Sequence, residues 1–414
     1  MKIVADLHVH TKYARATSPK NDISGLCEGA TVKGINVMAT GDFTHPVYFE
    51  ELKSQLTEND NGLFPYNNVH FILSSEISLI YSQDGKVRKM HHVMLAPSLE
   101  IAGQINDALS KIGNLSADGR PILGLSSAAF ADELFSISKD IAIIPAHIWT
   151  PWFAIFGSKS GVDTVEEAFE EHSKRIFALE TGLSSDPAMN WMLSALDKYT
   201  LVSNSDAHSL NKLGREANVF DLKTLSYDSI MNSIKTREGF VKTFEFYPEE
   251  GKYHYDGHRK CDINFSPWES KSRNNICPVC KKPLTIGVLH RVADLADRKL
   301  GFKPESAVPF EYIVPLHTII SKTLKKSETT QAVLAEYSKI IKYFGNEFSV
   351  FEADNDQIKL ATTPQIAESI IRVKEGKIKW IPGFDGVFGD LILDNSMPKK
   401  AVDKKQKSLD DFTP

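Results

Sequence analysis

At 414 residues the chain is longer than one compact domain requires, and with 42% hydrophobic and 24% charged residues it has the composition of an ordinary folded protein. Its formal net charge of −5 excludes a global attraction to nucleic acid or to an anionic membrane, so any site for a polyanion must be a local basic patch. No apolar run is long enough to span a bilayer and the first residues lack a signal-peptide pattern, so we expect a cytoplasmic protein without a membrane partner.

The first 247 residues alternate short apolar runs with helix-like stretches, which is the pattern of an α/β fold. Helices are predicted at about residues 21–34 and 99–113, and a capping-box pattern at Asp163–Glu166 predicts a third helix that continues to about Lys174. We count about seven strands, which predicts a distorted or incomplete (β/α)7-type barrel as the first domain, residues 1–247.

Residues with metal-binding side chains follow the apolar runs. The first run, Ile3–Leu7, leads into His8 and His10, and alternation along a strand places both imidazoles on one side, where they can share a metal ion. Later runs lead into Asp42, Glu76, His147, Glu180, and the pair Asp206 and His208. Donor residues at the carboxyl ends of successive strands are typical of the catalytic face of a β/α barrel. The support for Asp42 and Glu180 is their placement alone.

Alternation also separates neighbouring donors. His91 and His92 open a predicted strand at residues 90–97, where only one of them can face the site, and we prefer His91. Glu76 can bridge two metal ions through its two carboxylate oxygens.

The chemistry follows from the donor types. Carboxylates and imidazoles gathered in one place suit divalent zinc, manganese, iron or magnesium, and we expect two or three such ions in the barrel. Two ions a few ångströms apart can activate a water molecule and stabilise the leaving alkoxide of a phosphoester. The sequence has no Walker loop, nucleophile elbow or dinucleotide-binding fingerprint that would offer a competing chemistry.

An aromatic loop, Trp149–Gly161, directly follows His147 and carries four aromatic residues. Such a loop is either local core tucked over the mouth of the barrel or a surface on which bases stack beside the metal ions. The second interpretation assigns nucleic-acid contacts to Trp152, Phe153, Phe156, Ser158 and Lys159.

The composition changes at Tyr247–Gly251, which predicts a domain boundary. From residue 251 to residue 304 there are eleven lysine or arginine residues against five aspartate or glutamate residues. We therefore predict a basic module at residues 248–304, the local patch that the net charge requires of any polyanion site.

The basic module carries the spacing of a structural zinc site. Cys261 precedes the pair Cys277 and Cys280, and two close ligand pairs separated by a loop match tetrahedral zinc coordination. The fourth ligand is His258, with His254 as the alternative. Cys27 stands apart and is predicted to be a buried thiol.

Residues 305–396 are predicted to form a mostly helical C-terminal domain with one strand pair, at about residues 348–353 and 357–361, and a helix at 364–374. The glycine-rich segment 382–389 is either a simple turn, which we favour, or a close approach of the backbone to a ligand.

The tail, residues 397–414, is rich in lysine and low in apolar residues, and is predicted to be disordered. Its Gln406, Leu409 and Phe412 have the spacing of the sliding-clamp-binding motif of replication and repair proteins, so a sliding clamp is an expected partner.

Five segments together resemble the PHP (polymerase and histidinol phosphatase) family of metal-dependent phosphoesterases, namely Asp6–Thr11, Gly41–Asp42, Ser75–Glu76, Pro145–His147 and Ser205–His208. This resemblance implies a distorted barrel with a trinuclear metal site at the strand ends. Ala16 and Phe43 stand where many members carry histidine ligands, so part of the third ion's donor set is missing.

Further segments resemble the endonuclease Q family of DNA repair enzymes over nearly the whole chain, namely Thr150–Phe153, Glu180–Pro187, Leu213–Asn218, the cysteine module and the tail. The resemblance implies an endonuclease that cuts damaged double- or single-stranded DNA on the 5′ side of uracil, hypoxanthine, xanthine and abasic sites. In archaeal members this enzyme works with the sliding clamp, and such an enzyme would be associated with the nucleoid.

The same resemblance implies metal ligands at His8, His10, Glu76, His91, His147, Asp206 and His208, with Asp42 as a further candidate. Asp206, His147 and Glu76 are the expected catalytic residues, and Arg215 joins the aromatic loop as a candidate DNA contact. The basic module and the C-terminal domain would supply phosphate contacts.

Other functions fit the predicted barrel equally well on its own. A small-molecule phosphoesterase would hydrolyse phosphate monoesters without binding DNA, and an exonuclease would cut from DNA ends. A non-catalytic adaptor tethered to the clamp would leave the donor residues without a role. The roughly 165 residues after the barrel argue against the first, because a small-molecule enzyme does not need them.

Overall fold

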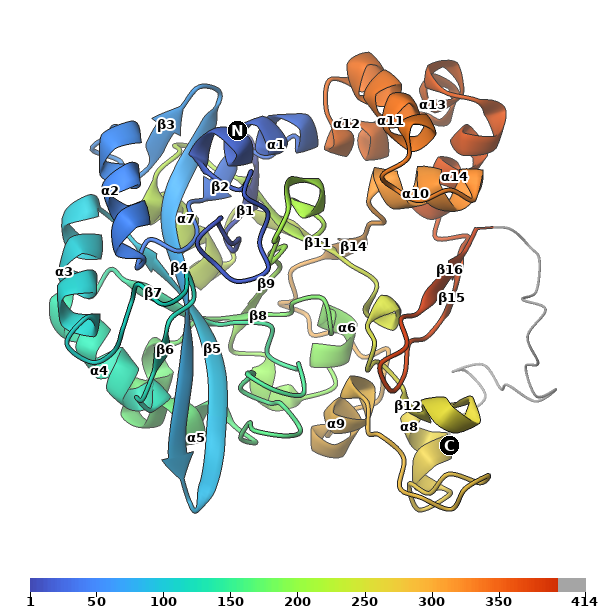
Figure 1. Cartoon of the computed structure of the whole chain (residues 1–414), viewed down its shortest axis with the longest axis horizontal. Coiled ribbons are helices and arrows are strands. Elements are labelled where there is room, and N and C mark those ends of the chain that lie inside the picture. Colours follow the sequence, from blue (N-terminus) through green and yellow to red (C-terminus); the bar gives the residue numbers. More distant parts are fainter. Residues whose placement is uncertain (394–414) are drawn as a thin grey trace.

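The structure, a computed structural model, describes residues 1–393 (Figure 1). Its central feature is a curled sheet in which eight strands follow the order β14-β11-β10-β1-β2-β4-β5-β7, with β3 and β6 each pairing with β4. The strands are β1 (Lys2–Asp6), β2 (Val37–Ala39), β3 (Phe64–Tyr66), β4 (Val69–Gln83), β5 (Lys86–Ala96), β6 (Ile122–Leu123), β7 (Ala142–Pro145), β10 (Ala217–Asp221), β11 (Phe240–Glu245) and β14 (Phe310–Tyr312). A parallel pair, β8 (Ala178–Glu180) and β9 (Thr200–Val202), stands beside β7. The predicted distorted α/β barrel is confirmed.

Seven helices belong to this part of the chain, and α2 to α5 lie outside the sheet along the left and lower left of Figure 1. They are α1 (Ile23–Lys33), α2 (Pro46–Gln55), α3 (Leu99–Leu109), α4 (Ser127–Ile137), α5 (Val165–Phe169), α6 (Pro187–Asn190) and α7 (Tyr227–Thr236). The first and third agree with the predicted helices at 21–34 and 99–113. Asp22 caps the first by accepting a hydrogen bond from the Gly25 N–H, and Gly34 ends it in the left-handed region at φ 90°.

The helix predicted to run from Asp163 to Lys174 is shorter and starts one residue later. Thr164 is its N-cap and accepts a hydrogen bond from the Glu167 N–H, so α5 begins at Val165, and the helix ends at Phe169. A 3-10 helix, Glu170–Arg175, continues the chain. The prediction placed the cap one residue too early because Asp163 and Thr164 are both good capping residues.

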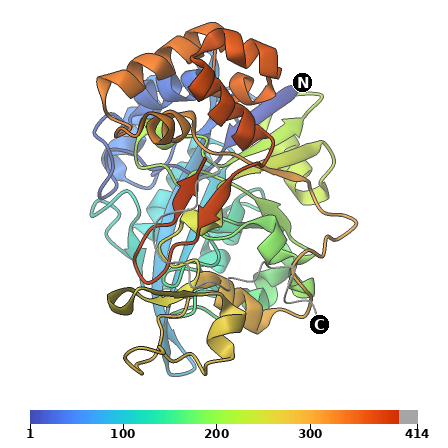
Figure 2. The ribbon, with the colours of Figure 1, turned by 90° about the vertical axis from the view of Figure 1, so that its right-hand side faces the viewer.

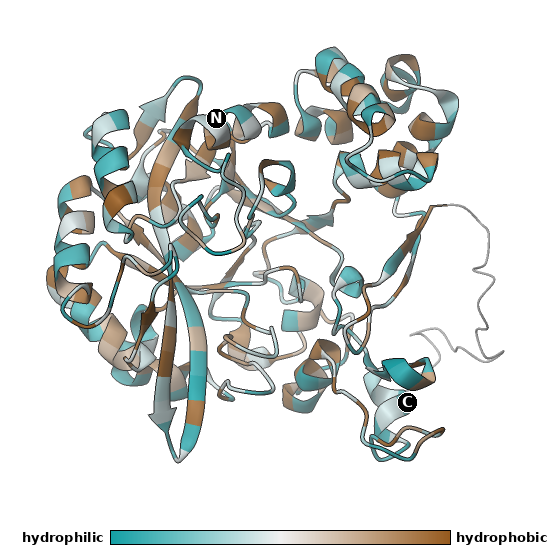
Figure 3. Cartoon of the chain, in the orientation of Figure 1, coloured by the Kyte–Doolittle hydropathy of each residue, from teal (hydrophilic) through white to brown (hydrophobic). Residues whose placement is uncertain are grey.

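β4 and β5 form a long hairpin whose far end projects from the body of the molecule (Figure 1). The predicted strand at residues 90–97 corresponds to the inner part of β5, which begins four residues earlier, at Lys86. Figure 3 shows that the projecting part of β5 is mostly polar, and its first residues are exposed while the inner half of the strand is buried.

The sheet has apolar residues on both faces. From β1 to the residue just beyond it, Ile3, Ala5 and Leu7 enter one buried cluster, while Val4 between them enters the other. This period of two is the strand geometry, and it makes β1 a fully buried central strand between β10 and β2.

Beyond the barrel, a small cysteine-containing unit comprises β12 (Asp256–His258), β13 (Ile263–Phe265), α8 (Pro267–Lys271) and α9 (Val288–Leu295). It is followed by a helical group, α10 (Leu316–Leu324), α11 (Gln331–Phe344), α12 (Glu347–Glu352), α13 (Asn355–Ala361) and α14 (Pro364–Lys374). The strand pair β15 (Lys379–Ile381) and β16 (Asp390–Ile392) completes the described chain. Figure 2 shows α10–α14 gathered at the end of the molecule where α1 lies. The helices have their own apolar core.

The strand pair predicted at residues 348–353 and 357–361 is wrong, because both segments are helices, α12 and α13. Asn346 caps α12, and Asp354 opens α13 with a capping box that includes Gln357. The real strand pair flanks the glycine-rich segment 382–389 instead. The predicted helix at 364–374 is confirmed as α14.

The C-terminal helices contact the barrel through buried groups. Lys33 of α1 pairs with Glu347 of α12 at 2.6 Å, and the ring of Phe348 stacks on Phe244 of β11 at 4.8 Å. Strand β14 reaches back to pair with β11. The division of the chain at residues 247, 304 and 396 stays a prediction. None of the helices within residues 1–393 is long and apolar enough to cross a membrane.

Candidate metal centre

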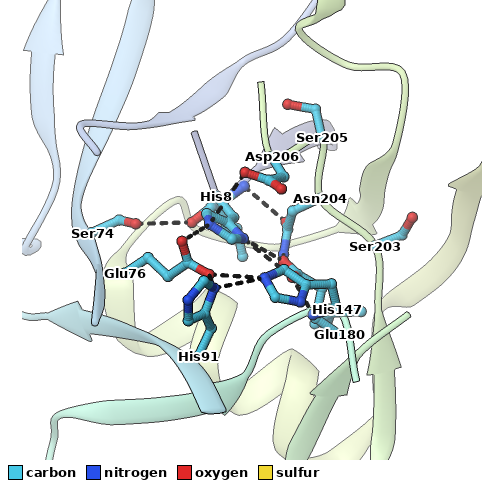
Figure 4. Close-up of polar contacts among 12 residues, drawn as sticks. His8, Ser74, Glu76, His91, His147, Glu180, Ser203, Asn204, Ser205 and Asp206 are labelled. Atoms are coloured by element: carbon cyan, nitrogen blue, oxygen red, sulfur yellow. Dashed lines mark hydrogen bonds and ion pairs between the residues drawn. The ribbon is translucent and has the colours of Figure 1, made fainter. Parts of the chain in front are cut away.

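The predicted metal ligands gather where β1 and β7 end and beside the middle of β4 and β5, which carry Glu76 and His91. Figure 4 shows several of these side chains pointing toward one another. The chain stays extended beyond β1 and pairs with a second ligand segment. Asp206 donates its backbone N–H to the His8 carbonyl at 3.0 Å, and His10 donates to the Ala207 carbonyl at 3.1 Å. Both imidazoles are fully buried. Backbone pairing therefore brings together ligands from opposite ends of the barrel sequence.

Glu76 lies at the centre of the cluster. Its Oε1 is 2.8 Å from His91 Nδ1 and 2.9 Å from His147 Nε2. Its Oε2 is 3.1 Å from His10 Nε2 and 3.7 Å from His8 Nε2. The two oxygens thus face two different imidazole pairs, the arrangement that a carboxylate bridging two ions requires.

Strand register explains why His91 and not its neighbour faces Glu76. In the antiparallel pair of β4 and β5, Ser78 is opposite His91, so His91 lies diagonally beside Glu76 on the same face. His92 points to the other face, where its Nε2 lies 2.8 Å from Ser127 Oγ.

Asp206 completes the ligand cluster on the remaining side. We call this cluster the cup, and its residues are His8, His10, Glu76, His91, His147, Asp206 and His208. Asp206 Oδ1 lies 3.3 Å from His10 Nε2, 3.9 Å from His8 Nε2 and 3.7 Å from His208 Nδ1. Among the described residues, three overlapping groups have donor atoms within 4.8 Å of one another: His8, His10 and Glu76; His10, Asp206 and His208; and Glu76, His91 and His147.

The backbone is strained at the ligand positions. Asp206 and His147 are not glycine, yet they have positive φ angles of 47° and 31°. Gly182 makes room for the second of these, because a Cβ at Gly182 would lie 2.5 Å from the His147 Cβ. Such strain is held only where surrounding structure over-determines it, and it clusters at functional sites.

Asp42 and Glu180 face imidazoles rather than the cup. Asp42 Oδ1 lies 2.9 Å from His10 Nδ1, and its Oδ2 accepts from Thr11. Glu180 Oε1 lies 3.0 Å from His8 Nδ1. Each carboxylate therefore fixes the ring so that its Nε2 points inward, and the metal-ligand role considered for Asp42 stays a prediction.

The donor set fits divalent cations. His8 Nε2 and Asp206 Oδ1 are buried polar atoms without a hydrogen-bond partner in the described structure, and both point into the cup. Burying a polar atom without a partner costs folding free energy, and a bound cation would be a partner for both atoms. Imidazole and carboxylate donors in these numbers suit zinc or manganese.

The electrostatics of the cup favour ionised carboxylates. Burial raises the pKa of Glu76, but the charges of His91 and His8 outweigh it and hold the pKa well below its usual value. Burial lowers the pKa of His8, but Glu180 and Glu76 outweigh it and raise the pKa well above its usual value. In the absence of a cation, protons on the imidazoles balance the charge of the carboxylates. Metal binding must therefore release these protons.

Residues that the strand-end pattern did not single out hold two parts of the site, namely Glu76 and the segment Ser205–His208, which we call the ligand loop. Asp6 accepts from the Ser205 and Gly214 N–H groups, each at 3.0 Å. Arg120 Nη1 donates to Glu76 Oε2 at 3.1 Å. Arg120 follows no apolar run, so no strand-end pattern could have identified it.

Two of the predicted DNA contacts make internal contacts in this structure. Phe156 is buried against Trp149, with ring centroids 4.9 Å apart. Arg215 donates to the Ser205 and Asp206 carbonyls, so it supports the ligand loop from inside. Burial and internal partners cannot be read from a loop sequence that is rich in aromatic residues.

The remaining loop residues lie at the surface. Trp152 is 47% exposed and meets Tyr253 edge to face at 6.1 Å, and Ser158 and Lys159 are exposed. The ring of Phe153 lies 4.7 Å from that of His91. Trp149 and Phe156 are therefore local core, as the first interpretation predicted. The nucleic-acid contacts of Trp152, Phe153, Ser158 and Lys159 stay a prediction.

The cysteine unit brings together four donors. Ligand atoms of His258, Cys261, Cys277 and Cys280 lie within 4.8 Å of one another, with Cys280 Sγ 3.6 Å from His258 Nδ1. His254 lies outside this group and is fully buried. Of the two histidines, the geometry therefore favours His258 as the fourth zinc ligand.

Comparisons with known proteins cover nearly the whole chain. Residues 315–377 match a family described as the MJ0043 C-terminal domain. An uncharacterised protein MJ0043 of Methanocaldococcus jannaschii is 32% identical over 251 residues, 59% of this chain, and the chain spans only 31% of that protein. An uncharacterised protein YqxK of Bacillus subtilis is 26% identical over 94% of this chain and 99% of its own.

Two solved structures resemble the chain over 95% of its length. One is the lesion-specific endonuclease PfuEndoQ of Pyrococcus furiosus, with a TM-score of 0.86, 29% identity and 96% of that chain covered. The other is endonuclease Q in complex with a 27-mer duplex that carries an abasic lesion at the active site, with a TM-score of 0.84, 29% identity and 97% coverage.

Fold and donor set define a metal-dependent hydrolase of the PHP-barrel type. The likeness to these two structures extends beyond the barrel to the cysteine unit and the C-terminal helices. The chain is an endonuclease Q-type protein, as the sequence resemblance predicted.

Proposed function

We propose that this chain is a DNA repair endonuclease that hydrolyses the phosphodiester on the 5′ side of deaminated bases and abasic sites. The observation that carries the proposal is the donor cup within a fold shared, end to end, with an endonuclease crystallised on an abasic duplex. Uracil, hypoxanthine and xanthine are the proposed deaminated bases. Such bases pair poorly, so flipping them out of the duplex costs less than flipping a normal base.

The cup would hold two divalent ions that share Glu76. His8, His10 and Asp206 would hold one, and His91 and His147 the other. His208 borders the first group and supplies a donor for a third ion, for which the remaining donors are missing at Ala16 and Phe43. The ions would supply an activated water and a charge clamp on the phosphoryl oxygens.

The protein's own groups perform the rest. Glu180 and Asp42 fix the ring orientation of His8 and His10, so the ligands need no rearrangement before the reaction. Phe153 and Trp152 offer aromatic faces beside the cup for an unstacked base. The basic module would contact phosphates, so binding would weaken as salt rises.

A nicking assay tests the proposal. An end-labelled duplex with one uracil or hypoxanthine is incubated with magnesium, manganese or zinc. A single cut on the 5′ side of the lesion, lost in Asp206→Asn and kept in the exposed control Asp228→Asn, is the expected result. Cutting from the ends would identify an exonuclease, and hydrolysis of a phosphate monoester without nicking would identify a small-molecule phosphoesterase.

We also propose that the tail binds a sliding clamp. Gln406, Leu409 and Phe412 lie outside the described residues, so this rests on their spacing alone. Clamp protein should stimulate nicking by the wild type but not by Phe412→Ala, while nicking without clamp should be equal for both. Equal stimulation of both proteins would refute the assignment.

A further inference from the structure

Arg120 brings a positive charge to the metal cup from a loop that carries no other candidate ligand. It precedes β6, and its Nη1 donates to Glu76 Oε2 at 3.1 Å. In the described part of the chain its other guanidinium N–H groups have no protein acceptor. Its side chain is 28% exposed, so it is within reach of both the cup and solvent.

The backbone around Arg120 is fixed. Asp118 Oδ1 accepts from the Arg120 N–H at 3.1 Å, and the Gly119 N–H donates to the Tyr13 carbonyl at 2.9 Å. Gly119 also packs so closely that a Cβ there would lie 2.5 Å from Asp42 Oδ2. Pro121 accepts from the Ser78 N–H of β4. The loop that carries Arg120 is therefore held in place on both sides of this residue.

The charge of Arg120 reaches both halves of the cup. It acts on the carboxylates of Glu76 and Asp206, which belong to different ligand groups. The direct contact between Arg120 and Glu76 Oε2 places the guanidinium next to the carboxylate that the proposed ions share. An arginine in this position can offer parallel N–H donors to a phosphate.

We propose that Arg120 is a catalytic residue that binds a non-bridging oxygen of the scissile phosphate; this rests on the proposed phosphodiester hydrolysis. In that reaction a water oxygen bonds to phosphorus, one P–O ester bond breaks, and a proton from the water ends on the leaving oxygen. Arg120 keeps its own proton throughout. Its fixed charge balances the negative charge that grows on the phosphoryl oxygens.

Three variants test the proposal. Arg120→Met removes the charge, Arg120→Lys keeps it without the planar donors, and Arg15→Met is the matched control, because Arg15 is 87% exposed and approaches the same Asp118. Each is assayed for kcat and KM on a lesion duplex, for bound metal by mass spectrometry, and for thermal unfolding. We expect Arg120→Met to lower kcat by about 100-fold with bound metal and melting unchanged. Lysine should restore part of the rate, and the control should match the wild type.

Two results would overturn the assignment. An unchanged kcat in Arg120→Met would remove the catalytic role, and a loss fully explained by lost metal would make Arg120 a positioning residue for Glu76. The same variants are assayed on bis(4-nitrophenyl) phosphate. If the wild type nicks no lesion duplex, the proposed repair function fails, while an Arg120 effect on this small phosphodiester still supports the phosphate contact.

Discussion

Two buried carboxylates, Asp42 and Glu180, determine how the imidazoles of the cup are aimed. Neither faces the cup, yet each accepts from the outer nitrogen of a ligand ring. Glu180 also accepts from the His147 N–H at 2.8 Å and from Asn204 Nδ2 at 2.8 Å. One side chain thus holds two ligand segments in register.

Glu180→Gln is expected to weaken metal binding by roughly 10–100-fold. The neutral amide is a poorer partner for His8, and its NH2 group would face one of the N–H donors that Glu180 now accepts. Zinc affinity measured by competition with a chelating dye checks this. Glu171→Gln, at an exposed position, is the control and should bind as the wild type does; equal affinities in all three would contradict the positioning role.

Glu245 predicts a pH dependence of stability. Burial raises its pKa to about 8, with Thr243 and Thr181 as hydrogen-bond partners. Its folded form keeps a proton that the unfolded chain loses above about pH 4.5, so stability falls as pH rises from about 4.5 to 8, by up to roughly 1.4 kcal/mol per pH unit. Glu245→Gln removes this proton uptake.

Urea unfolding at pH 5, 6.5 and 8 measures the effect. The difference in unfolding free energy between Glu245→Gln and the wild type should move in favour of the variant as pH rises. The exposed control Glu238→Gln should follow the wild-type curve. Parallel curves for all three proteins would show that Glu245 ionises in the folded state as it does in the unfolded chain.

At the residue scale, the sequence allowed the metal-binding side chains that follow apolar runs to be identified. It did not allow contacts between distant segments to be predicted. His8, Glu76 and His147 were identified because each follows an apolar run with a donor side chain. Arg120 and Arg215 could not be placed, because the partner of a loop arginine depends on how distant segments fold together. In the structure Arg120 donates to Glu76, and Arg215 donates to the Ser205 and Asp206 carbonyls.

At the scale of elements, the buried pair of Lys33 and Glu347 joins α1 to α12. Glu347 also accepts from the Leu316 N–H and from the Tyr337 hydroxyl. A buried charge with this many partners is compensated only while every partner is present.

Lys33→Met should lower the free energy of unfolding by about 3–5 kcal/mol, because it leaves Glu347 buried without a counter-charge. Chemical denaturation measures this loss. In the control Lys359→Met, which breaks an exposed pair with Asp356, the change should stay below about 1 kcal/mol. A small loss for Lys33→Met would mean that water reaches Glu347 at this interface.

Element prediction failed where caps compete with β-propensity. The run at residues 348–351 is rich in β-forming residues, but Asn346 and Asp354 supply N-caps on either side, and helix contacts with the barrel decide the outcome. Helices with clear caps and stops, such as α1 and α14, were predicted nearly to the residue.

At the scale of the whole molecule, the barrel and the cysteine unit divide the proposed work. The unit's stretch has an excess of positive charge in a chain that is negative overall. Arg291 of α9 ties it to the aromatic loop through the Phe156 and Val162 carbonyls. We therefore expect the unit to hold DNA while the barrel cuts it.

Cys280→Ala should lose one zinc per chain by elemental analysis and bind duplex DNA more weakly. Its hydrolysis of bis(4-nitrophenyl) phosphate should be unchanged, since this small substrate needs only the cup. Cys27→Ala is the matched control, because that buried thiol lies in α1 and should keep the wild-type zinc content. Unchanged zinc in Cys280→Ala would contradict the four-donor site.

The pairing of the segment after β1 with residues 206 and 207 has a consequence for synthesis on the ribosome. The first two ligands leave the exit tunnel early, but their partner segment follows about two hundred residues later. At typical elongation rates of about 5–20 residues per second, the nascent chain exposes these histidines for roughly ten seconds or more before the cup can close. The complete set of metal ligands therefore forms only after the barrel closes.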